Sequence, residues 1–153
     1  DNDPSGIIAV CRIGNIMYIY NAKSVWLEMP DLLRFIPQYM AQNFASKDST
    51  LQIEPKANGK SVVQMLKSIS TINVKPTPCP EDSKEVRFRV ASPTIECGRV
   101  VLVDGEWVED YLDNLCGFPA MAHDEYVDVT GYAINYLMDD DEIDYEQYSD
   151  FKL

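Results

Sequence analysis

The stretch TLQIEPKANGKSVVQMLKSI, residues 50–69, shows how this chain alternates strand and helix. Its first four residues are mostly β-branched or apolar and stop at Glu54 and Pro55, which is typical of a short strand. Asn58 and Gly59 then predict a turn, because both tolerate the backbone angles that turns need. Over the last eight residues, apolar side chains recur at helical spacing. The stretch therefore predicts a strand, a turn and a helix.

The residues before this stretch predict a hairpin and a helix. Residues 7–11 and 16–20 are β-type runs separated by a turn at Gly14. A second helix is expected to begin near Met29, because an apolar stripe at helical spacing follows it. Pro37 falls inside this stripe and predicts a kink or a break in the helix.

The residues after the stretch predict further strands and helices around one core. Residues 72–74 and 100–103 are expected to be strands, residues 107–116 and a segment from about 124 are expected to be helices, and residues 84–91 fit helix or strand equally well. With 153 residues in all, the chain predicts one domain at residues 1–138 and an acidic C-terminal tail at residues 139–153. The order of elements predicts a mixed α/β domain with helices packed on a sheet.

Composition and charge limit the functions that the chain can have. It is 46% hydrophobic and 25% charged, as soluble globular proteins are, and no apolar run approaches the ~20 residues of a membrane span. A net charge of −12 opposes nucleic-acid binding, because phosphate contacts need Lys and Arg. The charge is uneven, however: −2 for residues 1–55, +4 for 56–99 and −14 for 100–153. Only the middle part can present a positive face to a polyanion.

Glu54 is the first candidate functional residue. It follows the apolar strand directly, and ligands gather at the carboxyl ends of strands in open α/β sheets. The plain alternative is a solvated strand end.

Asp124, Glu125 and Asp128 are the second candidate group, at the start of the last predicted helix. Spacings of three and four residues put their carboxylates on one helix face. The helix dipole stabilises one or two acidic residues in a first turn, but three such residues also suit Mg²⁺ or Mn²⁺, which bind carboxylate oxygens. The spacing leaves both interpretations open.

Other kinds of site have weaker support. Residues 58–61 end like a phosphate-binding loop, but Glu54 stands where that motif needs its first glycine, which argues against an ATP site. His123 has no second His or Cys at ligand spacing, and the four cysteines are scattered. Structural zinc and a disulfide scaffold are therefore not expected.

Taken in order, several segments resemble the nuclease domain of phage terminase large subunits. Residues 53–61 resemble that family's I-E-x-K-A-x-G element, residues 84–100 its K-x-x-R … P … E-x-G-x-V stretch, and residues 107–128 its ending W … F-L-x-E-L … F-P … H-D-D-x-V-D. The match runs in register from about residue 3 to residue 138, and its specificity comes from the order and spacing of the motifs.

The resemblance implies an RNase H-like mixed sheet flanked by helices. It also implies a metal-dependent endonuclease that cuts double-stranded viral DNA during genome packaging in the host cytoplasm, with the ATP-driven motor in a separate domain. Mg²⁺ or Mn²⁺ would be the cofactor, the portal protein and the small terminase subunit would be partners, and no membrane would be involved. The catalytic and metal-binding carboxylates would be those of Glu54, Asp124, Glu125 and Asp128.

The chain departs from the family pattern in two places. The family's first catalytic Asp lies on an opening strand upstream of the part that residues 3–6 resemble, so the resemblance implies that this chain lacks that strand and that ligand. The second Asp of the H-D-D motif is Glu125 here, which keeps the charge but reaches one methylene further.

Basic residues of the middle segment are the candidates for contacts with DNA phosphates: Lys56, Lys60, Lys84, Arg87 and Arg89. The alternative function is a catalytically inactive, acidic RNase H-like module that contacts a basic protein partner. The net charge and the absent first Asp favour that alternative, whereas the ordered carboxylates favour the nuclease.

Overall fold

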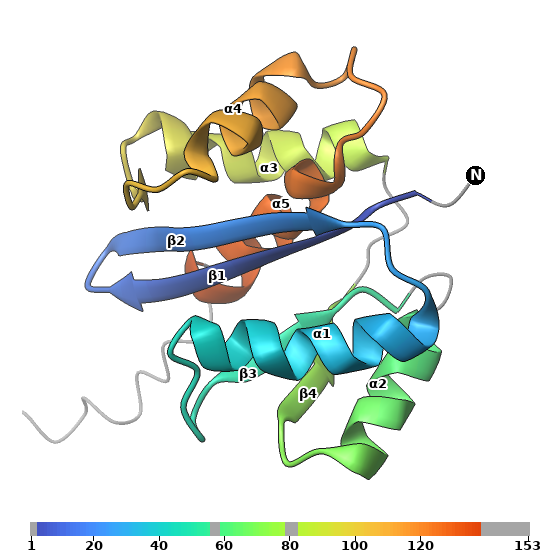
Figure 1. Ribbon diagram of the computed structural model, residues 1–153. Helices are drawn as coiled ribbons and strands as arrows, with labels where there is room; N and C mark the ends of the chain where they lie inside the picture. Colours follow the sequence, from blue (N-terminus) through green and yellow to red (C-terminus); the bar gives the residue numbers. More distant parts are fainter. Residues whose placement is uncertain (1–2, 56–58, 79–82, 139–153) are drawn as a thin grey trace, which may run out of the picture.

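A computed structural model describes residues 3–55, 59–78 and 83–138. The predicted acidic tail, residues 139–153, and Lys56 lie outside the described residues. The elements are β1 (Ser5–Ile13), β2 (Ile16–Val25), α1 (Met29–Gln42), β3 (Thr50–Ile53), α2 (Gly59–Ile69), β4 (Asn73–Pro76), α3 (Lys84–Glu96), β5 (Val100–Leu102), α4 (Val108–Gly117) and α5 (Glu125–Met138). The predicted mixed α/β class is confirmed (Figure 1).

The strands form two separate sheets. β1 and β2 make the predicted antiparallel hairpin, and Gly14 at its turn has a φ of 59°, which a glycine adopts without strain. β5 pairs with β2 in parallel, so the order of the first sheet is β1-β2-β5. β3 and β4 pair in parallel as a second sheet. Among the described strands, β1 therefore borders only β2, and β3 borders only β4.

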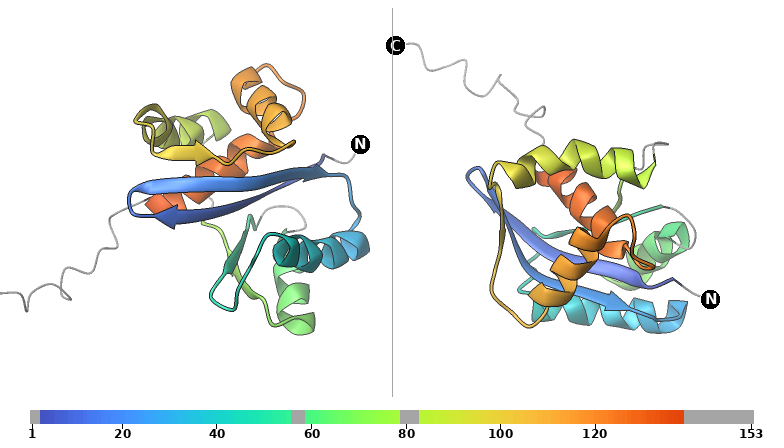
Figure 2. Two further views of the ribbon diagram at one scale, coloured as in Figure 1. Left: turned by 60° about the vertical axis from the view of Figure 1, so that its left-hand side comes forward. Right: turned by 90° about the horizontal axis from the view of Figure 1, so that it is seen from above.

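Two apolar clusters hold these sheets to their helices. The first lies between the hairpin and α4 and α5, around Met17, Ile19 and Tyr111, each at most 1% exposed. The second joins α1, α2 and β4, around Leu66 and Val74. Figures 1 and 2 show α3, α4 and α5 on one side of the hairpin and α1 and α2 on the other. α1 and α2 each bury one apolar stripe, as amphipathic helices of globular proteins do.

Pro37 does not end α1, which continues to Gln42. A proline inside a helix costs about 3 kcal/mol or more through a lost hydrogen bond and a steric clash. Burial of Leu33, Ile36 and Tyr39 on the same helix offsets that cost. Of the two expectations, a kink or a break, the break is wrong, because tertiary packing overrides the local penalty.

The ambiguous segment from Lys84 is helical. Ser83 lies before its first turn in an extended conformation, and its hydroxyl accepts a hydrogen bond from the Val86 amide at 3.3 Å. Such a cap satisfies an amide that the helix itself leaves without a partner. α3 thus places the side chains of Lys84 and Arg87 on one side of the helix, toward α5.

A cleft of about 1010 Å³ lies between the two sheets. Residues of β1 and β3 line it from facing strands, and residues of α1 and α5 also contribute. The edge of β1 away from β2 and the edge of β3 away from β4 thus border the same space. Within the described part of the chain, no helix has the length and apolar character to cross a membrane.

Candidate functional site

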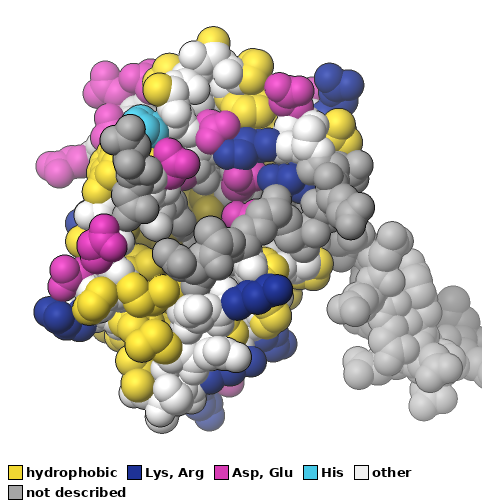
Figure 3. Space-filling view, turned by 90° about the vertical axis from the view of Figure 1, so that its right-hand side faces the viewer, with side chains coloured by type: hydrophobic (Ala, Val, Ile, Leu, Met, Phe, Trp, Pro, Cys, Tyr) yellow, Lys and Arg dark blue, Asp and Glu magenta, His cyan; other side chains and the backbone are white. Residues whose placement is uncertain are grey.

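The four predicted acidic residues all line the cleft between the sheets: Glu54, Asp124, Glu125 and Asp128. Glu54 follows β3 directly, and the other three lie at the start of α5. Figure 3 shows acidic side chains and the single histidine around a hollow in this face. The end of β3 and the start of α5 therefore border the same cleft.

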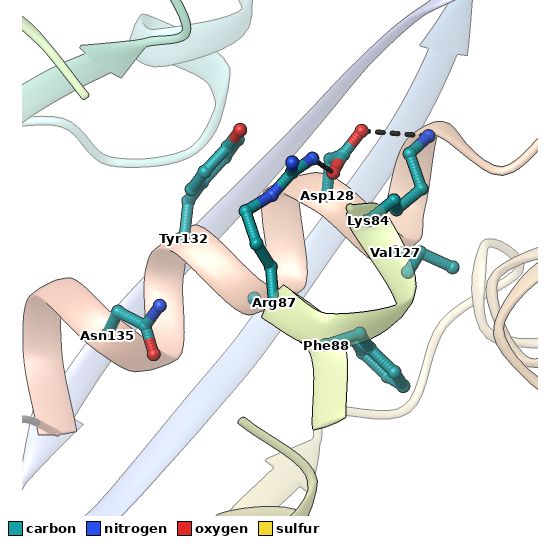
Figure 4. Close-up of a pocket in the computed structure, with 8 residues that line it drawn as sticks. Lys84, Arg87, Phe88, Val127, Asp128, Tyr132 and Asn135 are labelled. Carbon is teal, nitrogen blue, oxygen red and sulfur yellow. Dashed lines mark hydrogen bonds and ion pairs between the residues drawn. The ribbon is translucent and has the colours of Figure 1, made fainter. Parts of the chain in front are cut away.

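Asp124 and Asp128 converge on one cationic group from α3. The Lys84 ammonium lies 2.6 Å from Asp124 Oδ1 and 2.8 Å from Asp128 Oδ2. Arg87 Nη2 lies 2.6 Å from Asp128 Oδ1, so both carboxylate oxygens of Asp128 contact a cation (Figure 4). Asp124 lies directly before α5 and Asp128 in its first turn, and the three-residue spacing of Lys84 and Arg87 on α3 brings these groups face to face.

Burial makes this cluster more than a surface ion pair. The side chains of Arg87 and Asp128 are 11% and 17% exposed, and a charge at that depth needs a partner. Burial lowers the pKa of Lys84, but its hydrogen bonds to Asp124 and Asp128 outweigh this effect, so its pKa is raised from the ordinary value. The ammonium is therefore fully charged at neutral pH.

Glu54 is held toward α5 by a tyrosine. The Tyr132 hydroxyl donates a hydrogen bond to Glu54 Oε1 at 2.8 Å. The Tyr132 ring also lies 5.7 Å from the Arg87 guanidinium, within the range of a cation–π contact. Glu54 and Asp128 thus belong to one network that runs through Tyr132 and Arg87.

Gly59, the first residue of α2, is packed against the backbone of Glu54. A Cβ at this position would overlap the Glu54 carbonyl oxygen and also lie 3.0 Å from its carbonyl carbon. Only a glycine lets the two segments approach so closely. Gly59 therefore allows the start of α2 to pack against the backbone of Glu54.

Replacing Gly59 by alanine is expected to destabilise the protein by about 1–3 kcal/mol, as overpacking does. Because backbone atoms cannot yield as a flexible side chain does, Glu54 or α2 must move. Thermal unfolding measures the loss. Gly131→Ala is the matched control, since an added Cβ on α5 would meet no atom within 4 Å. Equal melting temperatures for the two variants would contradict the prediction.

Glu125 faces β1 rather than the lysine of α3. A Cβ on Gly6 would lie 3.0 Å from the Glu125 Cγ atom, so the glycine makes room for this side chain. Its Oε2 atom is buried and has no hydrogen-bond partner in the described structure. A buried carboxylate oxygen without a partner is costly, and a cation or water is the group that would satisfy it.

The carboxylate oxygens of the cleft are suitable ligands for a hard cation, but they lie apart in this structure. Asp124 and Asp128 already share one cation, the Lys84 ammonium, and Glu125 offers an unpaired oxygen. Among the described residues, however, no group of three or more His, Cys, Asp or Glu side chains lies together in a metal-binding arrangement. Carboxylate oxygens suit Mg²⁺ and Mn²⁺, and the four carboxylates would have to move closer to share an ion.

The predicted DNA-binding residues have different surroundings. Lys84 and Arg87 contact the carboxylates of α5. Lys60 and Arg89 are exposed on α2 and α3. The exposed pair can reach a polyanion without breaking a buried ion pair, whereas Lys84 and Arg87 cannot.

Sequence reasoning missed Tyr132 and Gly6. Tyr132 lies four residues after Asp128, so helical spacing alone places both on one face of α5. Gly6 had no such signal, because its closeness to Glu125 arises between elements far apart in the chain.

Comparisons with known proteins agree with this arrangement. The sequence profile of the family described as the terminase RNaseH-like domain matches residues 38–137. The chain belongs to this family. The match spans β3, α2 and almost all of α5, and therefore includes all four acidic residues of the cleft.

A solved structure has the same fold as this terminase domain. It is the crystal structure of the large terminase nuclease from thermophilic phage G20c with bound zinc. The two align with a TM-score of 0.59 at 15% identity, over 88% of this chain and 82% of that chain. The predicted RNase H-like fold is thus confirmed. No curated protein sequence gave a match.

Proposed function

We propose that this chain is the nuclease domain of a terminase large subunit, a divalent-metal-dependent endonuclease that cleaves double-stranded viral DNA during genome packaging. The observation that carries the proposal is the convergence of Asp124 and Asp128 on a single cation, in the cleft that Glu54 also lines. Membership of the terminase family supplies the reaction class. The portal protein and the small terminase subunit are the partners that this function requires.

The proposed roles follow from the positions of the side chains. Glu54, Asp124, Glu125 and Asp128 would hold Mg²⁺ or Mn²⁺ through their carboxylate oxygens. A divalent ion bound there would activate water and stabilise the leaving 3′ oxygen of a phosphodiester. Lys60 and Arg89, exposed on α2 and α3, would contact DNA phosphates, and Lys56 remains a candidate for the same role.

A second function has its own support. Lys84 and Arg87 form ion pairs with Asp124 and Asp128, and the net charge of −12 disfavours DNA. Both facts suit an inactive domain that binds a basic protein partner. The nuclease is preferred because an inactive domain gives no reason for four carboxylates to border one cleft.

A plasmid-cleavage assay tests the proposal. Supercoiled DNA incubated with Mn²⁺ is expected to become nicked and then linear, and an excess of EDTA is expected to abolish the reaction, because the carboxylates alone cannot activate water. The assay is run on this chain and on a form extended at its N-terminus by an apolar strand that ends in Asp-Pro. Intact plasmid with the extended form, in both Mn²⁺ and Mg²⁺, would exclude the nuclease and favour the interaction module.

A further inference from the structure

We infer that Tyr132 is a positioning residue, which holds the Glu54 carboxylate in place for ion binding. The inference rests on the proposed function and adds a residue to it. Its basis is the hydrogen bond of 2.8 Å from the Tyr132 hydroxyl to Glu54 Oε1. Tyr132 carries no charge and would not itself bind the ion.

Tyr132 joins the two elements that carry the acidic residues. Glu54 follows β3 and Asp128 lies on α5, and they are separated by more than seventy positions in the chain. Tyr132 lies one helical turn after Asp128, so its ring projects from the same face of α5 (Figure 4). Its hydroxyl therefore ties the end of β3 to the helix that carries the other carboxylates.

Arg87 holds the tyrosine in turn. Its guanidinium lies 5.7 Å from the centre of the Tyr132 ring, while its Nη2 atom binds Asp128 Oδ1 at 2.6 Å. The Arg87 side chain is only 11% exposed, so its position is fixed by packing. One arginine thus sets the orientation of Asp128 directly and that of Glu54 through Tyr132.

A hydroxyl in this place acts on the geometry of the carboxylate. Donation to one oxygen limits the rotation of the carboxylate plane. Partners of this kind behind a metal ligand change metal affinity by about 10–100-fold when they are removed. Loss of the Tyr132 hydroxyl is expected to act at that scale, with the ring and its packing retained.

The test is to measure, by calorimetry, the affinity of the whole chain for Mn²⁺. Tyr132→Phe is expected to weaken binding by about 10–100-fold. Glu54→Gln is also expected to weaken it, and adding Tyr132→Phe to Glu54→Gln is expected to cause little further loss, since the hydroxyl acts through Glu54. Tyr136→Phe is the matched control, because it removes the same atom one turn further along α5 from a side chain that is 49% exposed.

Each outcome supports or overturns a stated claim. If the wild-type chain binds Mn²⁺ and Glu54→Gln weakens binding but Tyr132→Phe does not, the inference is wrong and the proposed function stands. If neither the wild-type chain nor its N-terminally extended form binds Mn²⁺, both are wrong. Circular dichroism of each variant gives the folded fraction, and a loss of affinity that follows only the unfolded fraction would also overturn the inference.

Discussion

Replacing Asp128 by asparagine is expected to reduce Mn²⁺-dependent DNA cleavage at least about 100-fold. Asp128 is the carboxylate with the most contacts in the cluster, since its two oxygens bind Lys84 and Arg87 separately. Asparagine keeps the shape but removes the charge that an ion needs. A metal ion contributes several kcal/mol to transition-state stabilisation, and each 1.4 kcal/mol corresponds to a tenfold change in rate.

The rate at which supercoiled plasmid disappears measures this effect. Asp104→Asn is the control, because Asp104 is an exposed acidic residue after β5 that does not line the cleft. It carries the same change of charge and is expected to leave the rate unaltered. A fully active Asp128→Asn variant would remove Asp128 from the proposed site, and activity that survives Glu54→Ala in the extended form would end the nuclease proposal.

Adding an apolar strand ahead of Asp1 is expected to raise the melting temperature by about 10 °C. The cleft of about 1010 Å³ is bordered by β1 on one side and β3 on the other. A strand placed there can form main-chain hydrogen bonds with both and merge the two sheets. Each buried Val or Ile side chain contributes about 1.5–3 kcal/mol before the cost of ordering the chain, and a net gain of a few kcal/mol gives a shift of this size.

The experiment with the added strand has a matched control. A second extension of the same length carries proline at alternate positions, which removes the amides needed for pairing. This variant is expected to melt at the temperature of the unextended chain. Equal stabilisation by both extensions would show that the gain does not come from strand pairing. The Tyr39 hydroxyl is buried, lines the cleft and has no hydrogen-bond partner in the described structure. A strand that fills the cleft could give this hydroxyl a partner.

Local patterns were sufficient for most of the secondary structure. The hairpin, the strand at Thr50–Ile53 and the helix that follows it were predicted with errors of a few residues, because alternation, helical spacing and turn residues act over short distances. Two segments needed the folded structure. Pro37 stays within α1 because the helix buries its apolar stripe, and the segment from Lys84 is a helix because Ser83 caps it and α5 receives its inner face.

The candidate site was predictable in its residue types but not in its contacts. Asp124 and Asp128 share a helix face by spacing alone, and the strand–turn–helix stretch indicates Glu54. Their partners were not predictable: Lys84 meets Asp124 across 40 residues of chain and Tyr132 meets Glu54 across 78. The sequence made Lys84 and Arg87 candidates for DNA contacts, and in the fold both also contact carboxylates at the start of α5.

By itself, then, the sequence determined most of the elements, the family and the candidate acidic residues, since periodicity, turn chemistry and motif order are all contained within short segments. Only the tertiary structure decided that the β3 end faces α5, that Tyr132 bridges to Glu54 and that two basic side chains neutralise the cluster. The physical reason is that charges and hydrogen bonds between distant segments are set by how helices pack on sheets. That packing depends on the whole core and not on any one stretch.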